Sequence, residues 1–320
     1  MILNPKRIYE EFANSKISKT RAYDLLITLI ENSESEEIRV VSIKYLEKIG
    51  VFHDKLFNFL ENILISDSNR EIRNMAAKFL KNNFLEKSIN PFKWVIKHET
   101  DYECLIIAIK SLEKINSRET KLLLFNQIKI IIKTKYINKQ KRIENKKFKR
   151  IVKKFVKSKK YENFTHQELS DILINYLTIK NLITQYPNVY YELNPQNGLI
   201  EELDLSDFLE YEVKGTPFGW NNDIKSISEI LGLNNLKNIK KIDLSNNQIE
   251  DIKDLANLKN LKNLILTNNK ISNLENLEII KSLPNLVYLD LRYNDITKKI
   301  NPKEFDKNIR VILKDYLILK

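Results

Sequence analysis

Apolar residues in the C-terminal third of the chain recur in one fixed pattern. Three segments share the spacing of four aliphatic residues around one asparagine: 239–249, 261–271 and 286–296. The alternation within each segment predicts a short strand that turns its aliphatic residues toward a core. The asparagines Asn247, Asn269 and Asn294 follow each strand, where an amide side chain can satisfy backbone groups as the chain bends away. The pattern therefore predicts stacked parallel strands.

These segments resemble leucine-rich repeats, with the pattern L-x-x-L-x-L-x-x-N-x-I. Between them, apolar residues recur at every third position from Ile224 and again from Ile249, which suits 3₁₀ turns. The 22-residue form is similar to the SDS22-like class over residues 224–296. The last interval is longer, and its extra residues at 278–282 predict a helical turn. The resemblance implies a surface that binds another protein.

The segments on either side of the repeats predict caps. Residues 190–193 and 199–205 flank a turn at 194–198, so we expect a hairpin that covers the open edge and supplies the first strand. Residues 301–320 would close the other end, with a final strand at 310–313. Between hairpin and repeats, Phe218 and Trp220 either cover the first repeat or form an exposed aromatic anchor for a partner.

Strand residues that point away from the aliphatic core define the concave face of such an array. This set mixes both charge signs with two apolar contacts, and residues 198–320 as a whole carry a net charge of −1. Such a surface suits a protein partner better than a phosphate backbone, although these positions could also be soluble strand positions without a partner. The candidate partner-binding residues are Asp204, Lys241, Asp243, Ser245, Asn263, Ile265, Thr267, Tyr288, Asp290 and Arg292.

The N-terminal part shows a second periodicity, of helical type. Segments 38–46, 72–80 and 104–112 align without gaps, each with an apolar residue, a small residue four later and a leucine four after that. Each follows another apolar helical segment, and a polar turn such as 66–69 separates the two. Each unit therefore predicts a pair of packed helices.

These pairs resemble HEAT repeats. The resemblance depends on Asp67 followed by Ile72 and Arg73, with a weaker echo at Ser33 and Arg39. The third unit has Leu105 where the arginine is expected, which suits a terminal, capping unit. Tetratricopeptide repeats share the 34-residue period and remain an alternative, but their glycine, tyrosine and proline landmarks are missing. Either family implies an α-solenoid.

The middle of the chain holds its basic charge. Residues 129–160 contain fifteen Lys and Arg and one acidic residue, so this segment carries +14 and the rest of the chain −2. Apolar positions at 148–156 predict an amphipathic helix. It could be a connector that docks its apolar stripe on the solenoid, a surface for anionic lipid, or a nucleic-acid contact through the segment 139–160. The possible anion contacts are Lys146, Lys147, Lys149, Arg150, Lys153 and Lys154. A capping box at 165–168 then opens a helix that ends near Tyr186, with His166 expected in solvent.

No catalytic pattern is found in the sequence. The three histidines lie far apart, Cys104 occupies a core position of its repeat, and neither a phosphate-binding loop nor a dinucleotide fingerprint is present. One cysteine excludes an intramolecular disulfide, and no apolar run is long enough to cross a bilayer. We therefore expect a cytoplasmic, non-enzymatic protein without cofactor, metal or small-molecule substrate.

The sequence thus predicts an α+β repeat protein in three parts. Residues 1–125 form a HEAT-like α-solenoid, 126–187 a basic helical connector, and 188–320 a leucine-rich repeat domain with caps at both ends. The predicted function is a protein-interaction scaffold that binds a protein on its concave face. The alternative is binding of RNA or DNA through the basic segment, and membrane association is a third, weaker option.

Overall fold

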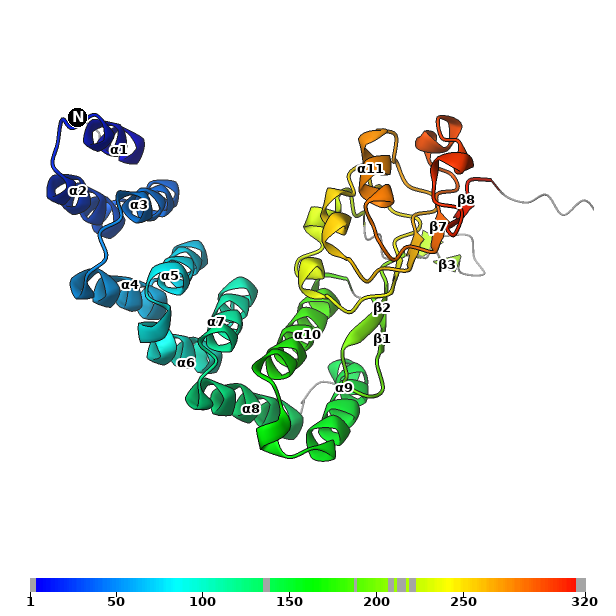
Figure 1. The fold of residues 1–320 in the computed structure, drawn as a ribbon, viewed down its shortest axis with the longest axis horizontal. Coiled ribbons are helices and arrows are strands. Elements are labelled where there is room, and N and C mark those ends of the chain that lie inside the picture. The colour runs from blue at the N-terminus through cyan, green and yellow to red at the C-terminus, as the bar shows by residue number, and fades with distance from the viewer. Residues whose placement is uncertain are drawn as a thin grey trace, which may run out of the picture. The chain divides into compact units, whose positions relative to one another are not determined.

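The computed structural model describes residues 4–134, 139–186, 189–206, 210–211, 217–218 and 223–314. The side chains of residues 139–145, 210–211 and 217–218 lie outside this description. The chain divides into two compact units, one of Met1–Ile130 with Phe164–Ser170 and the other of Ile131–Asn163 with Asp171–Lys320. The first is helical, and the second contains a sheet (Figure 1).

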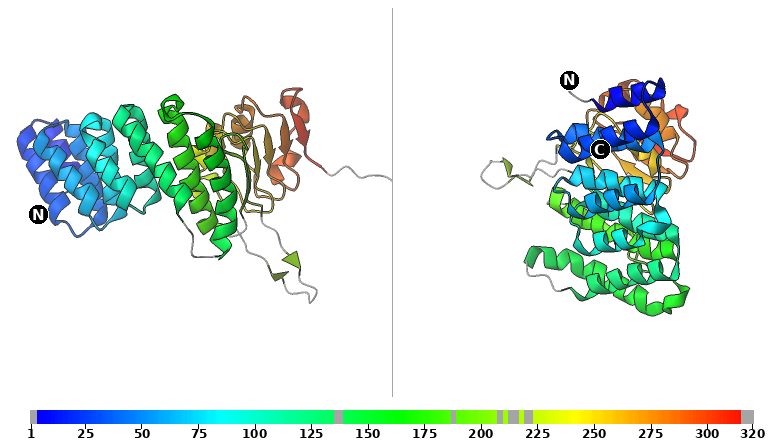
Figure 2. Two further views of the ribbon diagram at one scale, coloured as in Figure 1. Left: turned by 90° about the horizontal axis from the view of Figure 1, so that it is seen from below. Right: turned by 90° about the vertical axis from the view of Figure 1, so that its left-hand side faces the viewer.

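Helices in the first unit pack as successive pairs. Their bounds are α1 Pro5–Ala13, α2 Lys19–Asn32, α3 Glu36–Ile49, α4 Asp54–Ser66, α5 Arg70–Asn83, α6 Ile89–His98, α7 Tyr102–Ile115 and α8 Arg118–Lys133, with a 3₁₀ helix η1 at Leu85–Ser88. The pairs α2/α3, α4/α5 and α6/α7 lie where the periodicity predicts them, and α3, α5 and α7 pack side by side. Figure 2 shows this stacked order of the helices.

Small side chains allow the close approach of these helices. Ser42, Ala76 and Ala108 stand at the same place in the three predicted segments, and each is fully buried. A small residue lets two helix backbones come near each other, while the leucines four positions later fill the space between the layers. Most helices begin at a side-chain cap, such as Ser18, Ser35 or Asn69, that accepts a backbone N–H of the first turn.

Two long helices follow, the first in the second unit and the other divided between the units, since its residues up to Ser170 belong to the first unit. These are α9 Lys139–Ser158 and α10 His166–Gln185, with a 3₁₀ helix η2 at Tyr161–Asn163 between them. The capping box is confirmed, because Thr165 N donates to Glu168 at 2.8 Å and Glu168 N donates to the Thr165 hydroxyl at 3.1 Å. The expected exposure of His166 is wrong: its ring Nε2 lies 2.8 Å from the Ser117 carbonyl oxygen, and the side chain is partly buried.

A six-stranded sheet follows, in the order β1-β2-β5-β6-β7-β8. The strands are β1 Tyr190–Leu193, β2 Ile200–Asp204, β5 Lys241–Asp243, β6 Asn263–Ile265, β7 Tyr288–Asp290 and β8 Arg310–Ile312, while β3 Glu210–Tyr211 and β4 Pro217–Phe218 pair separately. β1 and β2 are antiparallel and all later neighbours are parallel. The predicted capping hairpin, first strand and final strand are confirmed.

The core of the sheet and its connections agree with the sequence pattern. Leu203, Ile242, Leu264 and Leu289 stand in one register row and are all buried. The predicted 3₁₀ turns are present as η3 Ile227–Glu229, η4 Leu233–Asn235 and η5 Lys253–Asn257. The longer last interval forms the helix α11 Glu275–Lys281, and η6 Asp295–Lys298 and η7 Pro302–Glu304 precede β8. Figure 1 shows these connections beside the sheet.

Candidate interaction surfaces

One side of the sheet is open to solvent in part, and it brings the predicted partner-binding residues into rows. Parallel register places Asp204 beside Asp243, Asp243 beside Ile265, and Ile265 beside Asp290. A second row contains Glu202, Lys241, Asn263 and Tyr288. Most of these side chains are half-buried, in alternation with the buried aliphatic row. We call these two rows the open face of the sheet.

Two carboxylates lie side by side at one end of the open face. Asp243 accepts hydrogen bonds from the backbone N–H of Ser245 at 3.0 Å and from its hydroxyl at 2.5 Å. Burial raises the pKa of the Asp243 carboxyl, and the neighbouring charge of Asp204 acts in the same direction. The Asp243 carboxylate is therefore a poorly solvated negative charge that a cation from a partner would stabilise.

The other end of the open face is internally paired. Asp290 is only 2% exposed and forms an ion pair with Arg292, whose Nη2 donates to Oδ2 at 2.8 Å. Burial alone would raise the pKa of Asp290, but the hydrogen bonds from Arg292 outweigh it and lower the pKa. Arg292 covers the Asp290 carboxylate, so Asp290 exposes little surface to a partner, and its assignment as a partner contact stays a prediction.

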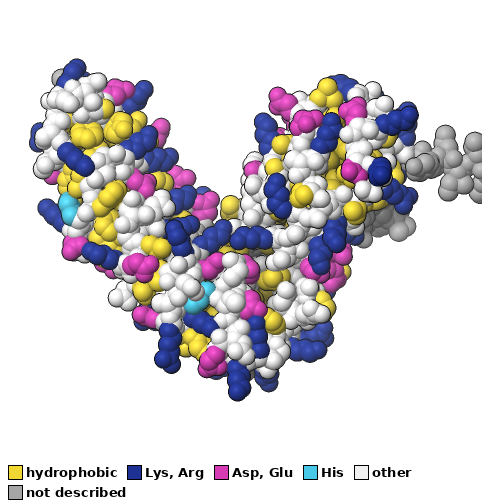
Figure 3. Space-filling view, in the orientation of Figure 1, with side chains coloured by type: hydrophobic (Ala, Val, Ile, Leu, Met, Phe, Trp, Pro, Cys, Tyr) yellow, Lys and Arg dark blue, Asp and Glu magenta, His cyan; other side chains and the backbone are white. Residues whose placement is uncertain are grey.

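β8 adds residues to the open face that the repeat pattern does not predict. Arg310 pairs in register with Tyr288, and Ile312 with Asp290. Arg310 is exposed, so it adds a positive charge beside the Tyr288 ring. The segment 310–313 lacks the repeat pattern, and only the expectation of a closing strand indicated it. Across the strand-containing unit, acidic and basic side chains are interspersed on the visible face (Figure 3).

The regular spacing of the asparagines has a direct structural role. Asn269 Nδ2 donates to the Leu244 and Leu266 carbonyl oxygens at 2.9 and 3.0 Å, and its Oδ1 accepts from Ile249 N at 2.9 Å. Asn247 and Asn294 make the equivalent contacts in their own repeats. All three side chains are buried, so this ladder satisfies backbone groups between adjacent turns rather than a ligand.

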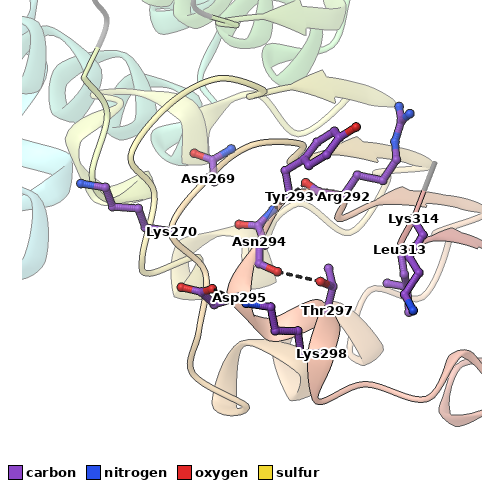
Figure 4. Close-up of a pocket in the computed structure, with 10 residues that line it drawn as sticks. All are labelled: Asn269, Lys270, Arg292, Tyr293, Asn294, Asp295, Thr297, Lys298, Leu313 and Lys314. Carbon is purple, nitrogen blue, oxygen red and sulfur yellow. Dashed lines mark hydrogen bonds and ion pairs between the residues drawn. The ribbon is translucent and has the colours of Figure 1, made fainter.

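An open pocket of about 440 Å³ lies beside this ladder (Figure 4). Its lining includes Lys270, Arg292, Tyr293 and Lys298, and Thr297 at its wall donates its hydroxyl to the Asn294 carbonyl oxygen at 2.7 Å. Tyr293 is 61% exposed and has a φ of 57°, where the two earlier repeats have asparagines. Asparagine tolerates this left-handed conformation better than tyrosine does, so the position is strained.

The predicted anion contacts divide into two groups on α9. Lys147 forms an ion pair with Glu192, and Lys149 donates to the Thr134 carbonyl oxygen at 2.5 Å. Burial lowers the pKa of the Lys149 amine. These two side chains make internal contacts, and their role as anion contacts stays a prediction. Lys146, Arg150, Lys153 and Lys154 are exposed.

The predicted aromatic anchor stays a prediction. Phe218 lies in β4, but its side chain is outside the described part of the structure, and so is the whole of Trp220. Both residues therefore rest on the sequence pattern alone.

The described residues also give no sign of a reactive cysteine or a metal site. Cys104 is fully buried, and burial raises the pKa of its thiol to about 12, which suppresses the reactive thiolate. Among the same residues, no three His, Cys, Asp or Glu side chains are grouped so as to hold a metal ion. The described helices also include none that is both long and apolar enough to cross a membrane.

No family model matches the chain, and neither a curated protein nor a solved structure matches it.

Proposed function

We propose that this protein is a non-enzymatic interaction scaffold that holds a protein partner on the open face of its sheet. In this proposal the face is the concave surface of an SDS22-like leucine-rich repeat array. The observation that carries it is the row from Asp204 to Asp290, in which half-buried Ile265 lies between Asp243 on β5 and the Asp290–Arg292 ion pair that begins on β7. An apolar centre with a polar rim is the usual anatomy of a protein interface.

The leucine-rich repeat assignment is supported by the packing of each turn. The strands pair in parallel with no register shift from β2 to β8, and each asparagine joins its own turn to the previous one. Stacked units of this kind present one side chain per strand at regular spacing of about 4.8 Å. A partner that spans β2 to β7 would meet several such side chains at once.

The HEAT-like assignment of the helical unit is supported by ion pairs between neighbouring repeats. Arg39 pairs with Asp67, and Arg73 pairs with Glu99 at 2.7 Å. Asp67 and Glu99 each precede by six residues the arginine position of their own repeat. The third repeat has Leu105 at that position, so the described ladder ends there. In the proposal, this unit is a second, helical repeat array of the same scaffold.

Site-specific crosslinking tests the proposed interface directly. A photoreactive phenylalanine analogue is placed at Ile265 and, in a matched control, at exposed Glu250, which precedes η5 and lies off the sheet. In the native cell, we expect a discrete protein adduct from position 265 and none of that mass from position 250. Ile265→Lys should then reduce recovery of that same protein at least tenfold, while Glu250→Lys should not.

Three results would contradict the proposal. These are no adduct at position 265, the same adduct at both positions, or full recovery of the adduct protein with Ile265→Lys. Thermal midpoints of both lysine variants within a few degrees of the wild type would exclude unfolding as the cause of lost binding.

A further inference from the structure

α9 has two faces with different surroundings. On one, Phe148 and Val152 are buried, at 1% and 0% exposure. The Phe148 ring lies 5.4 Å from the ring of Tyr176 on α10, and a Cβ at Gly198 would come within 2.8 Å of Val152 Cγ2. The apolar stripe therefore packs on α10 and on the turn before β2, within the strand-containing unit.

On the opposite face of α9, every exposed charged residue that the structure describes is a lysine or an arginine. Lys146, Arg150, Lys153, Lys154 and Lys157 are all exposed. At 100° per residue, these five positions fall within an arc of roughly 100°, centred opposite the buried stripe, and they span roughly 16 Å of helix. We call them the basic ridge. Lys157 belongs to it in addition to four of the predicted anion contacts.

No internal partner offsets this charge within the described part of the chain. None of the five ridge residues has an acidic side chain within ion-pair distance there, whereas Lys147 beside them pairs with Glu192. Positions 146 and 150, 150 and 154, and 153 and 157 are like-charged neighbours one turn apart, an arrangement that destabilises a helix. An external polyanion would remove that repulsion, so its binding and the stability of α9 are coupled.

We propose that the basic ridge binds the phosphate backbone of nucleic acid without reading its sequence. Five charges over roughly 16 Å are separated by four intervals of about 4 Å each, which is comparable to the axial spacing of about 3.4 Å between phosphates along one strand of duplex DNA. The ridge has no aromatic side chain to stack on bases and no amide side chain to contact adenine, and lysine and arginine make most of their nucleic-acid contacts to phosphate oxygens, so we expect phosphate contacts to dominate recognition. Insertion into a membrane is disfavoured, because Phe148, Ile151 and Val152, at the centre of the apolar stripe of α9, are already buried in protein.

Fluorescence anisotropy with the full chain tests this directly. The probes are a labelled 20-nucleotide RNA of mixed sequence and a labelled 20-base-pair DNA duplex, titrated between 50 and 200 mM KCl. We compare the wild type with Arg150→Gln/Lys153→Gln/Lys154→Gln, since glutamine keeps helix propensity and removes charge. The matched control is Lys237→Gln/Lys259→Gln/Lys262→Gln, which removes three exposed lysines from the same unit.

The ridge variant should bind at least tenfold more weakly than the wild type, while the control keeps its affinity within about twofold. On duplex DNA, log affinity should fall with log salt at a slope of about −4 to −5, and the ridge variant should lose about 2.7 of that slope. Absence of a complex at 50 mM KCl, or equal loss in both triple variants, would overturn the proposal.

Lysine acetylation footprinting of the wild-type chain tests the ridge without any variant. RNA should protect Lys146, Lys153, Lys154 and Lys157 from acetylation but not Lys237. Equal labelling with and without RNA overturns the proposal even if the ridge variant does not fold.

Sedimentation with vesicles containing phosphatidylserine distinguishes nucleic acid from a lipid surface. A wild-type chain that binds both nucleic acids and stays in the supernatant with vesicles supports the proposal. Ridge-dependent pelleting with vesicles, without any binding of the two nucleic acids, would overturn it and assign the ridge to lipid instead.

Discussion

Arg73 on α5 donates through Nε to Glu99 at 2.7 Å, and Nη2 of the same guanidinium donates to the other carboxylate oxygen at 3.1 Å. The two residues are 26 positions apart and belong to consecutive helix pairs. The Arg73 and Glu99 side chains are 16% and 5% exposed. Arg73 Nη1 also donates to the Asp67 and Ser68 carbonyl oxygens at 2.9 and 3.0 Å, so one side chain joins two turns.

Glu99→Gln should lower the free energy of unfolding by about 2 kcal/mol, because a largely buried arginine loses its charged hydrogen-bond partner. Glu103→Gln is the matched control, since Glu103 forms a 3.8 Å pair with Lys78 in which both side chains are half-exposed. The control should cost about 0.5 kcal/mol or less. Urea denaturation followed by circular dichroism measures both, and equal losses would contradict the prediction.

The contribution of Glu99 to the stability of the fold should also depend on pH. Burial alone would raise its pKa, but hydrogen bonds from Arg73 and from two backbone N–H groups lower it below its ordinary value of 4.5. Because the pKa of Glu99 is lower in the folded state than in the unfolded state, its carboxylate stabilises the fold fully above the unfolded-state pKa. This stabilisation is lost as the pH falls through the folded-state pKa. The stability difference between wild type and Glu99→Gln should therefore shrink below about pH 4.5. A difference that stays constant from pH 7 to pH 3 would contradict this.

Asp243→Asn should stabilise the fold at pH 7. Burial raises the pKa of Asp243 above its ordinary value of 3.8, so the ionised carboxylate is disfavoured in the folded state. Because the pKa of Asp243 is higher in the folded state than in the unfolded state, the protonated carboxyl favours folding below the unfolded-state pKa. That favourable contribution is lost as the pH rises through the folded-state pKa. The gain from asparagine should therefore disappear toward pH 3, as thermal midpoints at both pH values can show. A variant less stable than the wild type at pH 7 would contradict the sign.

Asn269→Ala should destabilise the sheet by about 2 to 3 kcal/mol. The change removes the hydrogen bonds that the buried amide donates to three backbone carbonyl oxygens, and it leaves the Ile249 N–H without its side-chain acceptor. Asn260→Ala is the control, because its side chain is exposed and makes a single bond to the Lys237 carbonyl oxygen. Chemical denaturation should show a clearly larger loss in the free energy of unfolding for Asn269→Ala than for Asn260→Ala. Similar losses would contradict the predicted contribution of the asparagine ladder to stability.

Gly198→Ala should loosen the packing of α9 on the turn before β2. Gly198 has a φ of 79°, which alanine tolerates poorly, and the added Cβ would lie 2.8 Å from Val152 Cγ2. We expect a loss of about 1 to 3 kcal/mol, from strain and from overpacking. Hydrogen exchange should show faster exchange of amides in 148–156, while exchange in α5 should be unchanged. Unaltered exchange in α9 would contradict this contact.

The repeat periods in the sequence were enough to place most helices and strands. The helix pairs, the parallel strands, the 3₁₀ turns, α11 and the capping hairpin lie where the periodicity puts them. The boundaries drawn between the three parts stay predictions, as do the family assignments. The candidate partner contacts were selected by strand alternation alone. That criterion finds half-buried Asp243 and Ile265, but it also selects Asp290, which is covered.

The sequence by itself determined which side chains of a helix or strand share a face, because helix and strand periods are local properties of the backbone. Tertiary structure alone decided which charges are available. Arg292 covers Asp290, Lys147 pairs with Glu192, and Arg73 reaches Glu99 in the next repeat. The two long-range pairs join residues 45 and 26 positions apart, and no local pattern encodes such a distance. The basic ridge consists of the charges on α9 that packing leaves without an acidic partner in the described part of the chain.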